Sequence, residues 1–139
     1  MRRILPLFAV FLLVGCITQA QADQKLADGC QSGIKGLLES SGKNIKEVKT
    51  IRYANEENND GMHRRITIEA VEQDGWLELE KEYSCLFMQE WGLFKSYHRA
   101  ALAQIILDEE LIGKKDGVIH GDVQTYLKLV ESIDQRMHQ

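Results

Sequence analysis

The feature that most constrains the fold is a β-hairpin signal centred on Asp74 and Gly75. Residues 65–87 read RITIEAVEQDGWLELEKEYSCLF, two runs of strand-forming residues on either side of that pair. An Asp-Gly pair between alternating apolar residues is the strongest short hairpin signal. With Asp74 and Gly75 as the loop, Gln73 is expected opposite Trp76. The pairs expected further out are Ala70 with Leu79, Ile68 with Lys81 and Ile66 with Tyr83.

Alternation along the two runs separates a core face from a solvent face, because successive side chains of a strand point to opposite sides. The inner face is predicted to hold Ile66, Ile68, Ala70, Leu77, Leu79, Tyr83 and Cys85. The outer face is predicted to hold Arg65, Thr67, Glu69, Val71, Glu78, Glu80, Glu82 and Ser84. Cys85 is therefore expected to point into the core.

The N-terminus predicts export. Arg2 and Arg3 precede an apolar run over residues 4–14, which is the order of a secretory signal. Those eleven residues are too few to span a membrane, which takes about 20. We therefore expect the protein in the periplasm.

Two processing routes remain open. LVGC over residues 13–16 resembles the bacterial lipobox, whose cysteine is acylated, and AQA over residues 20–22 fits an ordinary signal peptidase site before Asp23. We favour lipidation at Cys16, because all four lipobox positions fit. Ile17 then takes the second mature position, which by resemblance to known sorting rules implies the outer membrane. Residues 1–15 would be the signal and 16–25 a polar tether; on the alternative route, residues 1–22 are a signal peptide. Residues 26–139 are predicted to form one domain.

The cysteines predict a disulfide. Either route removes Cys16 from the count, which leaves Cys30 and Cys85 as an even pair in an oxidising compartment. Cys30 lies in an apolar stripe at helical spacing over residues 24–40. A helix laid on the apolar face of the hairpin would bring the two cysteines together, with a stabilisation of about 4 kcal/mol. Gly29, Gly33 and Gly36 are expected to let this helix approach the sheet. The stripe consists of Leu26, Cys30, Ile34, Leu37 and Leu38.

The remaining elements follow from shorter patterns. Residues 47–54 are predicted to form a strand, residues 55–61 a loop and residues 113–117 another loop. Residues 93–107 alternate as in a strand but also have helix-forming composition, and we predict a strand. A C-terminal helix is predicted with Asp122 as N-cap. Its apolar stripe consists of Tyr126, Leu127, Val130, Ile133 and Met137.

The predicted fold class is therefore α+β. An N-terminal helix is pinned by a disulfide to a three- or four-stranded antiparallel meander, and a C-terminal helix follows.

The order of a cysteine-bearing helix, the segment LLESSGKNIKEV, a hairpin and a second cysteine resembles a group of small exported bacterial proteins. Their pattern is a cysteine, Leu-Lys-Ser-Pro-Ser, a hairpin turn with Asn and Phe-Gly, and Phe-x-Cys. This chain departs from it: ESS at residues 39–41 lacks the proline, QDGW at residues 73–76 replaces the turn, and YSC at residues 83–85 stands for Phe-x-Cys. The resemblance covers residues 30–85. It implies a disulfide-pinned fold and carries over no catalytic residues.

Charge and motif content narrow the function classes. The formal net charge is −4, and residues 16–139 carry 15 basic and 21 acidic residues, a net of about −6. Nucleic-acid binding is disfavoured, because phosphate neutralisation needs a basic surface. The four histidines have no zinc-site spacing and are expected to be isolated surface residues. No Ser, Cys or Lys has the context of a catalytic nucleophile or a P-loop, so we expect neither enzymatic activity nor a metal or other cofactor.

The outer strand face suggests a partner surface. Glu78, Glu80 and Glu82 alternate along one strand, and Glu69 is expected opposite Glu80. Such carboxylates usually face solvent, but they could attract an envelope protein or another cationic partner. Unless a partner supplies charge, Lys95 or Arg99 is expected nearby. Together these features predict a small, non-enzymatic envelope protein that acts through macromolecular contact. The alternative is a periplasmic module that binds a small ligand or a cation.

Overall fold

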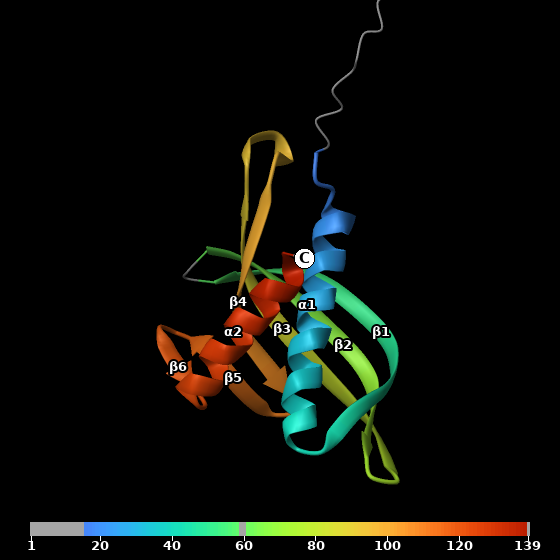
Figure 1. Cartoon of the computed structure of the whole chain (residues 1–139). Helices are drawn as coiled ribbons and strands as arrows, with labels where there is room; N and C mark the ends of the chain where they lie inside the picture. Colours follow the sequence, from blue (N-terminus) through green and yellow to red (C-terminus); the bar gives the residue numbers. More distant parts are fainter. Residues whose placement is uncertain (1–15, 59–60, 139) are drawn as a thin grey trace, which may run out of the picture.

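The computed structural model describes residues 16–58 and 61–138 (Figure 1). The predicted signal at residues 1–15 lies outside the described residues. The elements are α1 (Gln19–Ser40), β1 (Lys43–Asn58), β2 (Gly61–Asp74), β3 (Leu77–Trp91), the 3-10 turn η1 (Leu93–Lys95), β4 (His98–Leu107), β5 (Glu110–Lys115), β6 (Val118–His120) and α2 (Val123–Met137).

The strands form one antiparallel sheet in the order β1-β2-β3-β4-β5-β6, and both helices lie against the same face of it (Figure 1). We call this the inner face and the opposite one the outer face. Side chains from both helices and from the inner face form one apolar core. The predicted α+β architecture is confirmed, although the described residues contain six strands and not three or four.

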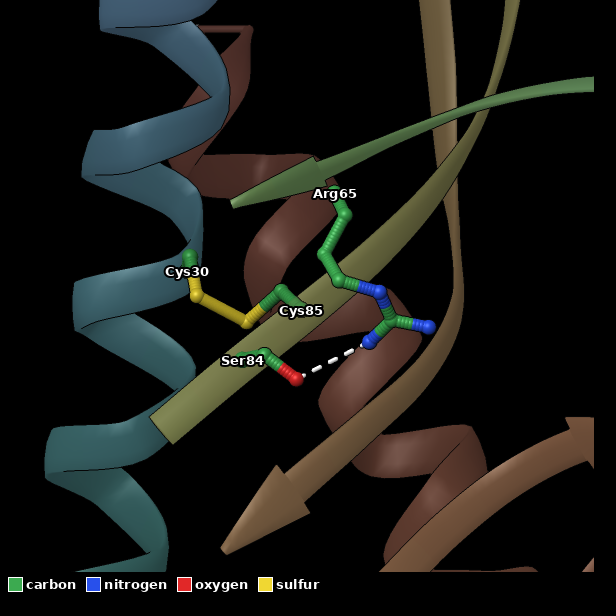
Figure 2. The surroundings of a disulfide bond; sticks show 4 residues. All are labelled: Cys30, Arg65, Ser84 and Cys85. Atoms are coloured by element: carbon green, nitrogen blue, oxygen red, sulfur yellow. Dashed lines mark hydrogen bonds between the residues drawn. A yellow bond between two sulfur atoms is a disulfide. The ribbon is translucent and has the colours of Figure 1, made fainter. Parts of the chain in front are cut away.

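The predicted disulfide is also confirmed. Cys30 of α1 and Cys85 of β3 are bonded, with 5.8 Å between their Cα atoms, and both side chains are fully buried. Figure 2 shows how alternation produces this contact: Cys85 points toward α1, whereas its neighbour Ser84 points to the outer face, toward Arg65. The bond joins the helix layer to the middle of the sheet.

The hairpin register differs from the prediction by two residues. Asp74 pairs with Leu77, and Ile66 pairs with Cys85, so the loop consists of Gly75 and Trp76. Gly75 has a φ of +63°, whereas Asp74 stays in the strand. A glycine at the first loop position is typical of a type II′ turn, whereas an Asp-Gly loop is typical of a type I′ turn. Because the shift is even, the side chains keep their predicted faces. Leu77 and Leu79 are nevertheless exposed and do not belong to the core.

α1 begins earlier than predicted. Thr18 caps the helix: its hydroxyl accepts from the backbone N–H of Gln21, and the Gln21 side chain accepts from the backbone N–H of Thr18. This capping box satisfies two N–H groups that the helix leaves unpaired. Ala22 and Asp23 are buried. Residues 19–25, expected to be a tether, are therefore the first turns of α1, and the folded unit begins before residue 26.

The helices pack closely because two glycines of α1 face α2. A Cβ on Gly33 would lie 2.6 Å from Ile133 Cδ1, and one on Gly29 would lie 2.9 Å from Met137 Cγ. Gly36, in contrast, faces open space. We expected all three glycines to let α1 approach the sheet, and this was wrong. Gly29 and Gly33 instead let α1 approach α2.

Other helix and strand boundaries also differ from the prediction. β1 extends to Asn58 and β2 begins at Gly61, so most of the expected loop belongs to strands. The expected loop at residues 113–117 contributes to the β5–β6 hairpin. Of the strand predicted at residues 93–107, residues 98–107 form β4, whereas Leu93–Lys95 form the turn η1. The C-terminal helix, with Asp122 as its N-cap, is confirmed. Leu127 is exposed, however, and Leu129 is buried in its stead.

Across residues 16–58 and 61–138, no helix combines the length and the apolar character needed to cross a membrane.

A candidate binding groove on the outer face of the sheet

A groove of about 1190 Å³ opens on the outer face and continues around the edge of β4. β5 pairs only with residues 104–107 of β4. In the part of the chain that the structure describes, residues 98–103 of β4 therefore have no strand on their other side. The β5–β6 hairpin and α2 border the opening. Its apolar lining includes Leu86, Met88, Ala101, Ile106, Leu111 and Ile119.

Two local features shape the groove. The register between β3 and β4 shifts after Leu86, so Ala103 is an extra residue that bulges from β4. Bulges bend a strand and increase its twist. Gly113 of β5 crosses this bulge with a φ of +123°, and a Cβ there would lie 2.4 Å from the Ala103 carbonyl oxygen. Only glycine tolerates both that conformation and that approach.

The polar side of the groove centres on Arg65. Its guanidinium donates to the Glu56 carboxylate (NH2 to Oε1, 3.0 Å) and to Ser84 Oγ (NH1 to Oγ, 2.9 Å; Figure 2). The hydrogen bond from Arg65 holds the pKa of Glu56 below its usual range. Arg65 is a cation and takes no proton from Ser84, so this contact orients the hydroxyl without activating it as a nucleophile.

A buried side-chain amide adds to the pairing of β5 with β4. Gln104 Nε2 donates to the Lys114 carbonyl oxygen at 3.2 Å, and Gln104 itself is buried. Lys114 and Lys115 lie at the rim with exposed side chains. The groove thus has an apolar floor, one anchored guanidinium and a rim that carries Lys114, Lys115 and the exposed carboxylate of Asp116.

Side chains also cover the free edge of β4. Lys25 Nζ donates to the His98 carbonyl oxygen at 3.1 Å, and the Tyr126 hydroxyl donates to the Leu102 carbonyl oxygen at 3.0 Å. Burial lowers the pKa of Lys25 and raises that of Tyr126. Capping the edge carbonyls in this way is one means by which sheets avoid unwanted strand pairing.

Two of the four histidines are buried, which corrects the expectation that all lie on the surface. His63 lines the groove opposite Glu56. His98 faces the helices, where Nε2 lies 3.0 Å from Gln89 Oε1 and Nδ1 has no hydrogen-bond partner within residues 16–58 and 61–138. Burial and then the nearby Lys25 ammonium lower the pKa of His98 to about 4, so its ring is neutral at physiological pH. His120 and His138 are exposed.

The four glutamates singled out in the sequence share the outer face but do not form a bare acidic patch. Lys46 pairs with Glu78, Lys49 with Glu80, and Arg52 with both Glu69 and Glu82 at 3.3 Å. Glu69 lies opposite Glu82 and not opposite Glu80. The lysine lowers the pKa of Glu80, and the glutamate raises that of Lys49. The neutralising cations come from β1, whereas Lys95 and Arg99 had been expected.

The groove was not predicted, because residues 113–117 were expected to form a loop and no strand was predicted directly on either side of them. A usable signal was present: Asp116-Gly117 is another Asp-Gly pair, and it lies between LIGKK and VIH. Among the described residues, no cluster of three or more His, Cys, Asp or Glu side chains is placed to hold a metal ion.

Comparison with known proteins places the chain in no family: no family model, curated protein or solved structure matches it.

Proposed function

We propose that the chain is an exported, non-enzymatic envelope protein, anchored through acylated Cys16, whose outer groove binds an extended segment of another envelope macromolecule. The observation that carries the binding role is the groove itself. Small-molecule pockets usually have volumes of about 300–1,000 Å³ and bury most of their ligand. The groove, at about 1190 Å³, is larger than that and open along the outer face, which suits a chain segment better than a small molecule.

The start of α1 supports processing at Cys16. A mature chain that begins at Cys16 keeps Thr18, the capping box and the hydrogen bond from Ile17 N–H to the Lys95 carbonyl oxygen. Cleavage after Ala22 would remove all of these and would make Asp23 the terminal residue. Asp23 is buried and bonded to Arg64, with distances of 3.0 and 2.8 Å from its carboxylate oxygens to Nε and NH2.

The groove's chemistry suggests the character of the partner segment. Its floor is apolar, and its rim carries two exposed ammonium groups, Lys114 and Lys115, against one exposed carboxylate, Asp116, so the rim is basic on balance. A segment with apolar side chains facing the floor and acidic side chains at the rim would match both features. Because the rim charges are exposed, they should affect the association rate more than the affinity.

Site-specific photo-crosslinking in intact cells tests this function. A benzoylphenylalanine replaces Met88, which lines the groove and is 49% exposed, or Leu127, which lies on α2 and is 52% exposed. The two sites are matched in exposure, so random collisions should label them equally. We expect one defined protein adduct at Met88, none at Leu127, and loss of the adduct when Ile119→Glu places a charge in the groove. Equal labelling at both sites, or a low-molecular-weight adduct at Met88, would contradict the proposal.

A further inference from the structure

The loop that joins β3 to β4 exposes large apolar side chains. We call residues 92–97 the β3–β4 tip. Leu93 is 83% exposed and Phe94 is 91% exposed. Phe94 and Lys95 both have left-handed backbone conformations, with φ of +55° and +56°. Such conformations are strained in residues other than glycine, and they often accompany functional loops.

The tip is nonetheless tightly organised. Gly92 N–H donates to the Tyr97 carbonyl oxygen at 2.9 Å, and Lys95 N–H donates to the Gly92 carbonyl oxygen at 3.0 Å. The Tyr97 ring packs over Gly92, where a Cβ would lie 2.3 Å from it. These contacts hold Leu93 and Phe94 outward as a preformed apolar wedge.

The tip lies beside the predicted lipid anchor. Ile17 N–H donates to the Lys95 carbonyl oxygen at 3.0 Å. Cys16, the neighbouring residue, is exposed and has a free thiol. Neighbouring Cα atoms are about 3.8 Å apart, so an acyl chain on Cys16 would start within one residue of the tip. In Figure 1 the tip and the start of α1 lie at the same end of the molecule, and the β2–β3 turn lies at the other.

The side chains behind the wedge are those favoured at a membrane surface. Trp91 is half-buried at the base of the tip, and Lys95 Nζ lies 5.5 Å from the centre of its ring. The guanidinium of Arg99 lies 5.2 Å from the ring centre of Tyr97. Tryptophan and tyrosine concentrate at bilayer interfaces, and lysine and arginine extend their charges from there to water.

We propose that the β3–β4 tip inserts Leu93 and Phe94 into the bilayer that holds acylated Cys16, so that two adjacent contacts orient the domain on the membrane. The proposal rests on the anchoring inferred above. An anchor at one point leaves the domain free to rotate, whereas insertion of the tip fixes which end faces the lipid. The groove would then be held at a constant height above the membrane.

The chain's two tryptophans provide a matched test, because Trp91 lies at the tip and Trp76 lies in the β2–β3 turn, 92% exposed. The lipidated protein is reconstituted into phosphatidylcholine vesicles whose acyl chains carry bromine, which quenches nearby tryptophan fluorescence. Trp76→Phe leaves Trp91 as reporter, and Trp91→Phe leaves Trp76 as control. We expect quenching of Trp91, strongest when bromine lies near the headgroup end of the acyl chain, and no quenching of Trp76.

A second variant separates the tip from the anchor. Leu93→Ser combined with Phe94→Ser should abolish quenching of Trp91, while mass spectrometry still finds acylated Cys16. If Cys16 is acylated and Trp91 is not quenched, the tip proposal is overturned and the anchoring stands. If the mature chain instead begins at Asp23, the anchoring fails. In that case the same brominated vesicles are added to the protein that begins at Asp23. Quenching of Trp91 but not of Trp76 would support insertion of the tip, and no quenching of Trp91 would overturn the tip proposal.

Discussion

The two faces of the sheet differ in what holds them together. On the inner face, Tyr83, Cys85 and Phe87 of β3 are almost completely buried under the helices. On the outer face, the glutamates of the same strand are solvent-exposed and pair with cations across β2. Burial and a covalent link therefore stabilise one face, while the other carries exposed ion pairs and a groove. Changes to the exposed glutamates of the outer face are therefore expected to leave the domain folded.

The largest expected effect is loss of the bond between helix and sheet. Replacing both cysteines, Cys30→Ser with Cys85→Ser, should lower the free energy of unfolding by about 4 kcal/mol, because the unfolded chain regains the entropy that the closed loop removes. Urea denaturation measures this change. Dithiothreitol should produce a similar loss in the parent protein and none in the double variant. An unchanged midpoint in the double variant would mean that packing alone holds the inner face.

The next largest effect should come from the buried ion pair at the start of α1. Asp23→Asn leaves the Arg64 guanidinium without its anion in a site where both side chains are only 12% exposed. Breaking such a pair typically costs about 3 kcal/mol. Asp28→Asn is the matched control, since Asp28 lies on the exposed side of the same helix and bonds only to Gln24 among the described residues. Equal losses from the two variants in thermal unfolding would show that the Asp23 contact is not special.

Replacing two glycines of α1 by alanine should change the free energy of unfolding in opposite directions. Gly33→Ala forces Ile133 to move and should cost about 1–2 kcal/mol through overpacking. Gly36→Ala meets nothing within 4 Å and should stabilise the protein by about 0.5–1 kcal/mol, because alanine loses less backbone freedom on folding. Calorimetric unfolding of both variants tests the close approach of the helices. Stabilisation by both would place α2 farther from α1.

The smallest effect is expected on the outer face. Replacing Glu78, Glu80 and Glu82 together by glutamine removes repulsion between glutamates, but it also leaves Lys46, Lys49 and Arg52 with fewer partners. Exposed ion pairs contribute little to stability, so the unfolding midpoint should stay nearly constant and depend less on salt. Loss of folding in the triple variant would show that these side chains do not face solvent.

Much of the fold could be predicted because its signals are local. Alternation in residues 65–87 assigned both faces of the central hairpin, and helical spacing placed Cys30 against Cys85. The strand register was harder to predict, since it depends on whether Asp74 or Gly75 is the first residue of the two-residue loop. The even shift kept Cys85 on the inner face, so the disulfide prediction survived the error.

The cations of β1 and the groove could not be predicted, because they depend on irregular strands and on contacts between distant residues. Lys46, Lys49 and Arg52 recur every third residue, but β1 contains two register shifts, after Ile45 and after Val48. Each shift adds a residue, and the period of two is therefore broken where these cations turn to the outer face. The groove arises from the Ala103 bulge and the close crossing at Gly113. Both features depend on how β4 pairs with its neighbouring strands, and no local sequence pattern indicates that pairing.

The most direct test of the whole account is mass spectrometry of the protein recovered from cell envelopes without reduction. We expect a mature N-terminus at acylated Cys16 and a non-reduced peptide that links Cys30 to Cys85. One experiment thus examines export, anchoring and the bond between helix and sheet. Free thiols at both Cys30 and Cys85 would contradict the pinned fold in the native compartment, and an unmodified N-terminus at Asp23 would contradict the anchor.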